Sequence, residues 1–267
     1  VLSLNIGSRP DIVGVPGAAD FATPVKPINR FVDRWHKLVD RVLGQPGPHR
    51  IAVVGAGAAG TEIVLAIQFR LRQLLDEQGR YDEALEMHLV SKSARVMPAH
   101  APGVSRRFDR ILDERGVNVY RGTAATRAAD NTLVLSDGKS LELDEILWVT
   151  GASAPAWLRD SGLDVDEHGF INVYETLQTT ADTHVFAAGD IANVLNFPRP
   201  KAGVFAVRQG KPLTNNLRRA LVDQPLQAFS PQKTMLALIS TGDKYAEDQH
   251  LVKRGQDRAA VVFLPGA

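Results

Sequence analysis

Runs of apolar residues alternate between strand-like and helix-like spacing through the middle of the chain. Ile51–Val54 and Met87–Val90 are short, continuous apolar runs that predict buried strands, because a buried helix needs a longer segment. Between them, Ala59–Glu77 repeats apolar residues at helical spacing and predicts an amphipathic helix that ends near Gly79. The other elements predicted in this region are a helix over Val104–Arg115 and strands over Val117–Tyr120 and Ile146–Val149.

A hairpin interrupts this alternation. Leu133–Leu135 and Leu141–Leu143 flank the segment "SDGK", which is a good signal for a tight turn between antiparallel strands. Strands that alternate with helices favour a parallel sheet, so residues 50–150 predict a βαβαβ unit with a hairpin or meander inserted. The expected fold class is therefore α/β, with a three-layer, Rossmann-type domain.

The segments on either side of this unit carry weaker patterns. Val1–Ile6 predicts a strand and Ile28–Leu43 a helix, and the cluster "GQPGPHR" (Gly44–Arg50) is the favoured domain boundary. A later helix is expected over Ala202–Leu221, and Pro212 should kink or split it because proline cannot donate the helical hydrogen bond. The further strands expected are Phe170–Val173, His184–Ala187 and a strand-like region that starts with Met235–Ser240.

Composition excludes several classes of function. The 267 residues include 31 basic and 30 acidic side chains, so the net charge of +1 gives no reason to expect a nucleic-acid partner. The absence of cysteine excludes a disulfide framework and a redox-active dithiol, and seven scattered histidines indicate no metal site. No apolar run approaches the ~20 residues that span a bilayer, so a cytoplasmic protein is the default. Because the chain starts at Val1 in an alternating apolar stretch, we expect a fragment or a trimmed chain.

The sequence "IAVVGAGAAGTE" (Ile51–Glu62) carries the clearest chemistry. Gly55, Gly57 and Gly60 fit the pattern G-x-G-x-x-G, with a predicted strand before it and an amphipathic helix after it. The first glycine permits a tight turn, the second lets the backbone approach a pyrophosphate, and the third lets helix and strand pack closely. The loop expected to bind a dinucleotide is Gly55, Ala56, Gly57, Ala58, Ala59 and Gly60.

The acidic residue that normally binds an adenosine ribose is absent. It should stand at the carboxyl end of the second strand, where "LVSKSAR" offers Ser91, Lys92 and Arg95 as candidate cofactor contacts and no carboxylate. An acid would bind the 2′-hydroxyl and repel a 2′-phosphate, so its absence beside cations permits NADPH and slightly favours it. The alternative is that Lys92 points to solvent, and the choice between NADH and NADPH stays open.

Two later segments have no explanation in a single Rossmann domain. "ILWVTGAS" is a strand that ends in Thr150-Gly151, and "THVFAAGDIAN" is a strand that ends in Gly189-Asp190. Together with the glycine motif, these segments resemble the pyridine nucleotide-disulfide oxidoreductases, which are flavoproteins with two dinucleotide sites. Within that superfamily the sequence is most similar to the type II NADH dehydrogenase-like branch. The segments "WLRDSGL", "PKAGVFAVRQG" and "LALISTGDKYA" resemble flavoproteins associated with selenide, water dikinase.

The resemblance implies a role for each matching position. The glycine loop would hold the NAD(P)H pyrophosphate, and Glu62, the catalytic candidate, would lie near the junction of nicotinamide and flavin. Asp190 would bind the flavin ribitol. The other positions matched to cofactor binding are Thr150, Gly151, Gly189, Ala202, Gly203 and Val204, the last three beside the pyrimidine edge of the flavin. On their own residues, Gly189-Asp190 could be a turn with an N-cap, and Glu62 a first-turn acid favoured by the helix dipole.

The sequence also departs from this superfamily. Nothing before Val1 supplies the second G-x-G-x-x-G, which holds the FAD pyrophosphate, so FAD binding should be weak or absent in this chain. Without cysteine, electrons would pass from flavin directly to an external acceptor such as a quinone. The resemblance also allows a homodimer, and peripheral membrane association in an intact protein only, because the last residues lack an amphipathic tail.

The expected function is that of an FAD-dependent NAD(P)H oxidoreductase, and the alternative is a non-catalytic module that binds or senses NAD(P)H. The expected architecture is an NAD(P)H-binding Rossmann domain inserted in a partial FAD-binding domain. The parts expected are a partial FAD segment with linker (1–45), the NAD(P)H domain (46–150), the second part of the FAD domain (151–225) and the start of a C-terminal region (226–267).

Overall fold

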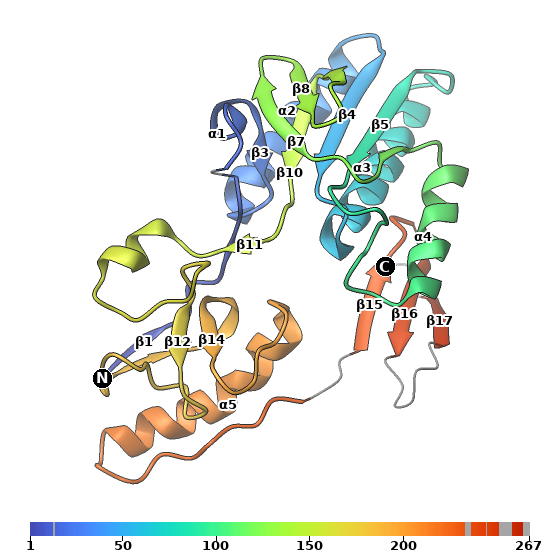
Figure 1. The fold of residues 1–267 in the computed structure, drawn as a ribbon. Helices are drawn as coiled ribbons and strands as arrows, with labels where there is room; N and C mark the ends of the chain where they lie inside the picture. Colours follow the sequence, from blue (N-terminus) through green and yellow to red (C-terminus); the bar gives the residue numbers. More distant parts are fainter. Residues whose placement is uncertain (13, 233–235, 244, 251–257, 264–267) are drawn as a thin grey trace. The chain divides into compact units, whose positions relative to one another are not determined.

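The chain forms two compact units, which we describe separately (Figure 1). The computed structural model describes residues 1–12, 14–232, 236–243, 245–250 and 258–263. Unit 1 comprises Val1–Arg9 and Ala152–Met235, and unit 2 comprises Pro10–Gly151 and Leu236–Ala267. The short strands β2 (Arg9–Pro10) and β11 (Ala152–Ser153) form a two-stranded sheet. In the described residues, no helix is long and apolar enough to cross a bilayer.

Unit 2 contains the predicted parallel sheet. Its strand order is β3-β10-β4-β5-β6, and every neighbouring pair is parallel. Two helices, α3 and α4, form the crossovers from β4 to β5 and from β5 to β6, which confirms the βαβαβ prediction. The bounds are β3 (Thr23–Pro24), β4 (His49–Val54), α3 (Ala58–Glu77), β5 (Leu85–Val90), α4 (Pro102–Glu114), β6 (Asn118–Tyr120) and β10 (Glu145–Trp148).

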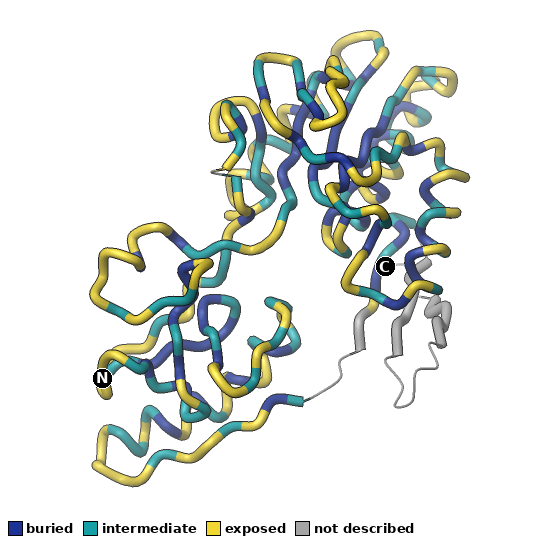
Figure 2. The backbone as a smooth tube through the Cα atoms, viewed as in Figure 1, coloured by how far each residue is buried: buried dark blue, intermediate teal, exposed yellow. Residues whose placement is uncertain are grey.

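The central strands are mostly apolar and largely buried, because both faces of the sheet are covered (Figure 2). Ile51 and Val53 of β4 pack into one core with helices α2 (Ile28–Gly44), α3 and α4. Ala52 and Val54, which alternate with them, pack into a second core on the opposite face. Helices therefore cover one face of the sheet and a small antiparallel sheet covers the other, as a three-layer fold requires.

That antiparallel sheet contains strands β7 (Ala125–Ala129), β8 (Thr132–Leu135) and β9 (Ser140–Glu142). The predicted β8–β9 hairpin is confirmed. Strand β7 was not expected, because its sequence "ATRAA" has no apolar run. Its Ala125 and Ala128 are buried in the second core beside helix α1 (Ala18–Phe21), where larger side chains are not needed.

Unit 1 is built from two pairs of short parallel strands and one long helix. Strand β1 pairs with β13, and β12 pairs with β14. A core that includes Phe186, Ile191 and Leu213 joins these strands to helix α5. The bounds are β1 (Leu2–Leu4), η1 (Ala156–Asp160), β12 (Ile171–Val173), β13 (Val185–Ala187), η2 (Gly189–Ile191), β14 (Ala192–Val194) and α5 (Gly203–Ala220).

Helix α5 runs through Pro212 as one element, so of the two expected outcomes, a kink or a split, the split is wrong. Proline removes the hydrogen bond to the carbonyl of Arg208, and Arg208 lies on an exposed part of the helix where water can replace it. Buried residues lie on both sides of Pro212: Gln209 accepts the N–H of Gly189 (2.6 Å), and Leu213 packs in the core of unit 1.

The described C-terminal strands belong to unit 2. Strands β15 (Leu236–Ser240), β16 (Tyr245–His250) and β17 (Arg258–Phe263) form an antiparallel sheet, and Ile239 of β15 is buried in the core that contains α3. The strand-like region expected from Met235 to Ser240 is β15, although Met235 itself lies outside the described residues.

The favoured domain boundary, Gly44–Arg50, lies inside unit 2. Helix α2 precedes this segment and packs on the same core as α3 through the buried side chains of Leu38 and Val42. Residues 10–44 are therefore grouped with the parallel sheet and not with unit 1. The assignment of residues to cofactor domains stays a prediction.

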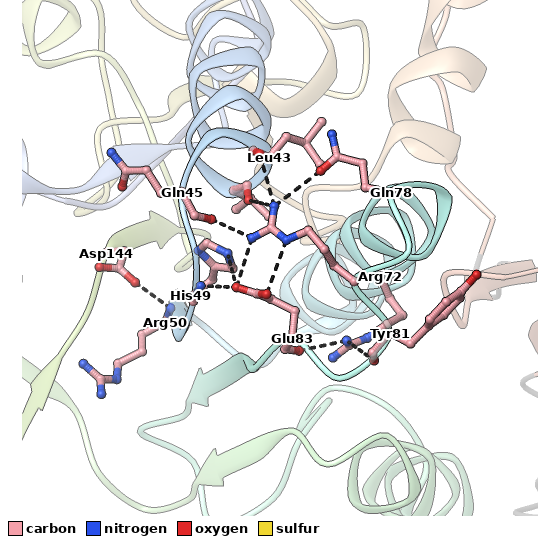
Figure 3. A network of polar contacts seen from close by, with 12 residues as sticks. Leu43, Gln45, His49, Arg50, Arg72, Gln78, Tyr81, Glu83 and Asp144 are labelled. Carbon is pink, nitrogen blue, oxygen red and sulfur yellow. Dashed lines mark hydrogen bonds and ion pairs between the residues drawn. The ribbon is translucent and has the colours of Figure 1, made fainter.

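A polar network holds the segment between α2 and β4 in place (Figure 3). The Arg80 guanidinium donates to the carbonyl oxygens of Val42 (3.0 Å), Leu43 (3.1 Å) and Gln45 (2.6 Å), which lie at the C-terminal end of α2. Glu83 pairs with Arg80 at 3.0 Å. The last carbonyls of a helix have no N–H donor within the helix, so the Arg80 guanidinium supplies the missing donors. These bonds fix the conformation of the Gly/Pro-rich turn that follows α2.

Candidate functional site

The glycine loop connects β4 to α3 and has three different local geometries. Gly55 has φ = 114°, and a Cβ there would lie 2.5 Å from the carbonyl oxygen of Val149. A Cβ on Gly60 would lie 1.7 Å from the carbonyl oxygen of Gly55, so only glycine allows the helix to pack this close. A Cβ on Gly57 would meet no atom within 4 Å. The first and third glycines are thus required by the fold, whereas the second faces open space.

The open part of the loop offers unpaired backbone donors. Gly57 is the N-cap of α3 and makes no side-chain capping hydrogen bond. The first N–H groups of a helix, here those of Ala58, Ala59 and Gly60, have no intrahelical acceptor and add to the positive end of the helix dipole. This combination of open space and free donors fits a pyrophosphate.

The loop also lies at the point where ligands bind in open α/β sheets. Strand β4 is flanked by β10 on one side and β5 on the other, and the chain goes from β4 first to β5 and only later to β10. Such a reversal of strand order leaves a crevice beyond the carboxyl ends of the strands. The close approach of Gly55 to Val149 places the ends of β4 and β10 together there.

The segment after β5 folds back onto the glycine loop, where Met97 N–H donates to the carbonyl of Ala56 (2.6 Å). Of the three candidates in it, Ser91 is buried and its hydroxyl donates to the carbonyl of Ser93 (3.0 Å). Arg95 donates to carbonyls of its own loop, Pro98 (2.8 Å) and His100 (3.0 Å). Lys92 is exposed. The loop therefore uses Ser91 and Arg95 for its own structure and leaves Lys92 as the accessible cation.

Glu62 lies in α3, one turn beyond the glycine loop, and contacts the C-terminal strands. Its carboxylate accepts a hydrogen bond from the backbone N–H of Ser240 (2.8 Å) at the end of β15. Partial burial raises the pKa of the Glu62 carboxyl, and the bond from Ser240 opposes that rise. Sequence reasoning missed this contact, because the pairing of residues so far apart has no local signal.

Thr150 and Gly151 follow β10 and bind the segment that leads into unit 2. The Thr150 hydroxyl donates to the carbonyl of Asp11 (2.6 Å), to which the Trp148 indole N–H also donates (2.8 Å). Asp11 N–H in turn donates to the carbonyl of Gly151 (2.9 Å). These two candidates hold backbone in the structure, and cofactor contact by either stays a prediction.

Unit 1 has a pocket that brings together three of the candidates, Gly189, Asp190 and Ala202. Gly189 has φ = 76°, and its N–H donates to the side-chain oxygen of buried Gln209 (2.6 Å). The Asp190 carboxylate accepts a hydrogen bond from the Ser8 hydroxyl (3.2 Å). The tight turn at Gly189 thus presents a carboxylate at the pocket.

Helix α5 begins at the same pocket. Ala202 is its extended N-cap (φ = −140°) and makes no side-chain capping bond. Gly203 and Val204 are the first residues of the helix, so their N–H groups have no intrahelical acceptor. Ala202 lines the pocket, whereas Gly203 and Val204 do not, so flavin contact by the N–H groups of these two residues stays a prediction.

Sequence reasoning missed Lys201, which lines this pocket immediately before α5. Its ammonium donates to the carbonyl of Ala192 (2.7 Å) and lies 4.0 Å from the centre of the Phe170 ring. Burial lowers the pKa of Lys201, and the negative charges of Asp166 and Asp190 oppose that change. A signal was present in the sequence, since Lys201 and Gln209 are the polar residues of "PKAGVFAVRQG" that line the pocket.

In the described residues, no group of three or more acidic or histidine side chains could hold a metal ion.

A family model described as pyridine nucleotide-disulphide oxidoreductase matches residues 3–210. The chain belongs to this family. The match includes the glycine loop, the strand that ends in Thr150-Gly151 and the pocket at Gly189-Asp190.

Curated relatives agree with this assignment. The chain is 31% identical over 260 residues to the type II NADH:quinone oxidoreductase of Haemophilus influenzae, which covers 85% of the chain and 57% of the relative. It is 24% identical over 252 residues to the demethylphylloquinone reductase NdbB of Synechocystis, covering 90% of the chain and 59% of the relative. The chain thus spans less than two thirds of the length of these relatives.

Solved structures show the same fold. NDH2 from Plasmodium falciparum in complex with NADH is similar with a TM-score of 0.72 at 11% identity, covering 92% of the chain and 68% of that structure. The water-forming NADH oxidase from Lactobacillus brevis bound to NADH has a TM-score of 0.72 at 20% identity, covering 93% and 51%. The α/β prediction with a parallel sheet and an antiparallel insertion is therefore confirmed.

Proposed function

We propose that this protein acts as an FAD-dependent NAD(P)H oxidoreductase that passes electrons to a small external acceptor. The observation that carries the proposal is the glycine loop, in which Gly55 and Gly60 are required by packing while Gly57 faces open space. A loop that served packing alone would not need its second glycine. Membership of the family supports a flavin as the redox partner of the nucleotide.

In this proposal the residues of the chain bind and orient, while nicotinamide and flavin supply the hydride chemistry. The first N–H groups of α3 bind the nucleotide pyrophosphate in unit 2. In unit 1, Asp190 accepts hydrogen bonds from the flavin ribitol, and the free N–H groups of Gly203 and Val204 donate to the ring. Glu62 is the proposed catalytic residue, which orients the nicotinamide.

The acceptor is proposed to be a quinone. The 267 residues contain no cysteine, so the chain itself offers no dithiol to take up electrons. The names of the Haemophilus and Synechocystis relatives include quinone substrates, which supports that class of acceptor here. A homodimer, peripheral membrane association and a link to selenide, water dikinase stay predictions.

A non-catalytic NAD(P)H-binding module is the second candidate. It is favoured by the sequence itself, which contains one G-x-G-x-x-G motif, at Gly55–Gly60, and the structure places that motif in unit 2. Such a module would bind nucleotide at the same loop without retaining a flavin.

The visible absorbance of the purified protein, before and after incubation with excess FAD and gel filtration, distinguishes the two functions. For the oxidoreductase we expect flavin bands that NADH or NADPH bleaches without oxygen, and turnover with a short-chain quinone. A colourless protein that binds nucleotide but shows no turnover would instead support the module.

A further inference from the structure

The pocket at the start of α5 is lined by an ammonium group, that of Lys201, which donates only one hydrogen bond within the described residues. Lys201 donates one hydrogen bond, to the carbonyl of Ala192 at 2.7 Å, and its charge lies 4.0 Å from the Phe170 ring centre. An ammonium has three N–H donors. Within the described residues, Ala192 is its one hydrogen-bond acceptor, so donor capacity remains at a pocket that this residue lines.

A purely structural role does not explain a lysine at this position. Removing an ammonium from water costs free energy unless charge or hydrogen bonds compensate, and a neutral side chain could bind the same carbonyl without that cost. Asp166 and Asp190 supply part of the compensation, as their charges favour the protonated lysine. A partly buried ammonium at this position therefore points to a hydrogen-bond acceptor in the pocket itself.

Helix α5 adds to the same electrostatic environment. Its N-terminus begins at Ala202, the residue after Lys201, and its first N–H groups have no intrahelical acceptor. The ammonium and the positive end of the helix dipole thus occur side by side in the chain. Their combined field favours a ligand edge that carries oxygen atoms and gains negative charge.

We infer that Lys201 is a positioning residue that holds the carbonyl edge of the bound flavin and favours the reduced form of the ring. The inference rests on the proposed function, because it assigns the ligand of this pocket. It predicts that the charge of Lys201, and not its packing, raises the reduction potential of the flavin.

The test compares four variants loaded with FAD. Lys201→Met keeps the aliphatic chain and removes the charge, Lys201→Gln can still donate to Ala192, and Lys201→Arg keeps the charge. Lys211→Met removes an exposed charge from the same helix and is the matched control. Thermal unfolding confirms that each variant folds, and the readouts are the FAD dissociation constant and the midpoint potential of the bound flavin.

We expect Lys201→Met and Lys201→Gln to weaken binding of reduced flavin about tenfold more than that of oxidised flavin. For a two-electron couple, this ratio lowers the midpoint potential by about 30 mV. Lys201→Arg and Lys211→Met should stay close to wild type.

Four results would overturn the inference. An unchanged potential in Lys201→Met and Lys201→Gln, with lower thermal stability, would make Lys201 a structural clamp between β14 and α5. An equal shift in Lys211→Met would show that any charge on the helix has this effect, and a Lys201→Arg potential as low as that of Lys201→Met would exclude charge as the cause. A wild-type protein that takes up no flavin would overturn this assignment of Lys201 and favour the second candidate function, the nucleotide-binding module.

Discussion

The carboxylate of Glu62 accepts the backbone N–H of Ser240 at 2.8 Å, which ties the helix of the glycine loop to the C-terminal strands of the same unit. The contact is reinforced nearby, because Gly242 approaches the backbone of Leu65 so closely that a Cβ on it would lie 2.5 Å from the Leu65 carbonyl group. Arg115 at the end of α4 also pairs with Asp243. The residue proposed to orient the nicotinamide is therefore itself held by strand β15.

Replacement of Glu62 should separate its charge from its hydrogen bond. Glu62→Gln keeps an acceptor for Ser240, whereas Glu62→Ala leaves a partly buried N–H without one and should destabilise the protein by about 1–3 kcal/mol. Burial raises the pKa of the Glu62 carboxyl above its ordinary value of 4.5. The folded state therefore binds this proton more tightly, and the stability it contributes is complete below 4.5 and lost as the pH rises through the folded pKa.

Urea unfolding between pH 4 and pH 8 measures this effect. The stability of the wild type relative to Glu62→Gln should decrease as the pH rises from about 4.5, the unfolded value. A difference that stays constant over this range would show that Glu62 ionises equally in both states. If Glu62 also orients the nicotinamide, Glu62→Gln should reduce flavin by NAD(P)H about tenfold more slowly, a loss of about 1.4 kcal/mol.

The glycine loop predicts opposite outcomes for two alanine substitutions. Gly57→Ala adds a Cβ that meets no atom within 4 Å, so stability should stay within about 0.5 kcal/mol of wild type. The added methyl group occupies the open face where the pyrophosphate binds, and nucleotide affinity should fall about tenfold. Gly60→Ala places a Cβ 1.7 Å from the carbonyl oxygen of Gly55 and should destabilise the fold by about 1–3 kcal/mol or more.

Thermal unfolding and NADH fluorescence titration check both variants. Full nucleotide affinity in a folded Gly57→Ala protein would argue that the loop is only a packing device. A stable Gly60→Ala protein would contradict the close approach of α3 to the turn after β4.

Much of this fold could be predicted from the local sequence pattern. The strands of the parallel sheet are buried on both faces and appear as continuous apolar runs, and its helices are buried on one face and repeat apolar residues at helical spacing. Strand β7 could not be predicted in this way, since "ATRAA" contains no apolar run and buries only small side chains. Its extended conformation depends on pairing with β8. Likewise Pro212 predicted a kink or a split, but buried residues before and after it, Gln209 and Leu213, keep α5 a single helix. Tertiary packing overrides local preference in both cases.

The candidate site divides in the same way. The packing roles of Gly55 and Gly60 follow from residue types in a fixed order, so the sequence sufficed to predict them, whereas cofactor contact at Gly57 and Gly189-Asp190 stays a prediction. The Glu62–Ser240 bond joins residues far apart in the chain, and the inward position of Lys201, which donates to Ala192, is defined by the folded pocket. Ser91 follows β5 as expected, but its hydroxyl donates to the carbonyl of Ser93 in its own loop, a contact that the sequence pattern does not show.

A buried carboxylate on β10 should make the sheet sensitive to charge removal on α2. Glu145 is almost fully buried and pairs with Arg34 (2.8 Å) and Arg41 (3.0 Å), whose side chains remain partly exposed. The double substitution Arg34→Met with Arg41→Met leaves the Glu145 carboxylate without an ion pair and should lower the free energy of unfolding by about 3 kcal/mol. This value is at the lower end of the range for breaking a buried ion pair, because both arginines are partly exposed. Adding Glu145→Leu should restore much of the loss.

Chemical unfolding of the three proteins measures this, with Arg121→Met as the control. Arg121 pairs with Asp109 at 2.6 Å in a more exposed position, so its removal should change stability by no more than about 1 kcal/mol. Equal losses in the control and in the double variant would mean that the burial of Glu145 adds nothing to the cost.

Nucleotide preference should depend on Lys92. The segment after β5 contains no carboxylate to bind a ribose 2′-hydroxyl or repel a 2′-phosphate, and Lys92 is its accessible cation. Lys92→Ala should therefore weaken NADPH binding about tenfold and leave NADH binding nearly unchanged. A charge-assisted hydrogen bond to phosphate contributes about 1.5–3 kcal/mol, and the solvent exposure of Lys92 reduces this contribution toward the lower value. Arg95→Ala should weaken both nucleotides alike, since Arg95 supports the loop through the carbonyls of Pro98 and His100. Titration of each variant with both nucleotides tests the assignment, and a wild-type protein that strongly prefers NADH would exclude a phosphate contact at Lys92.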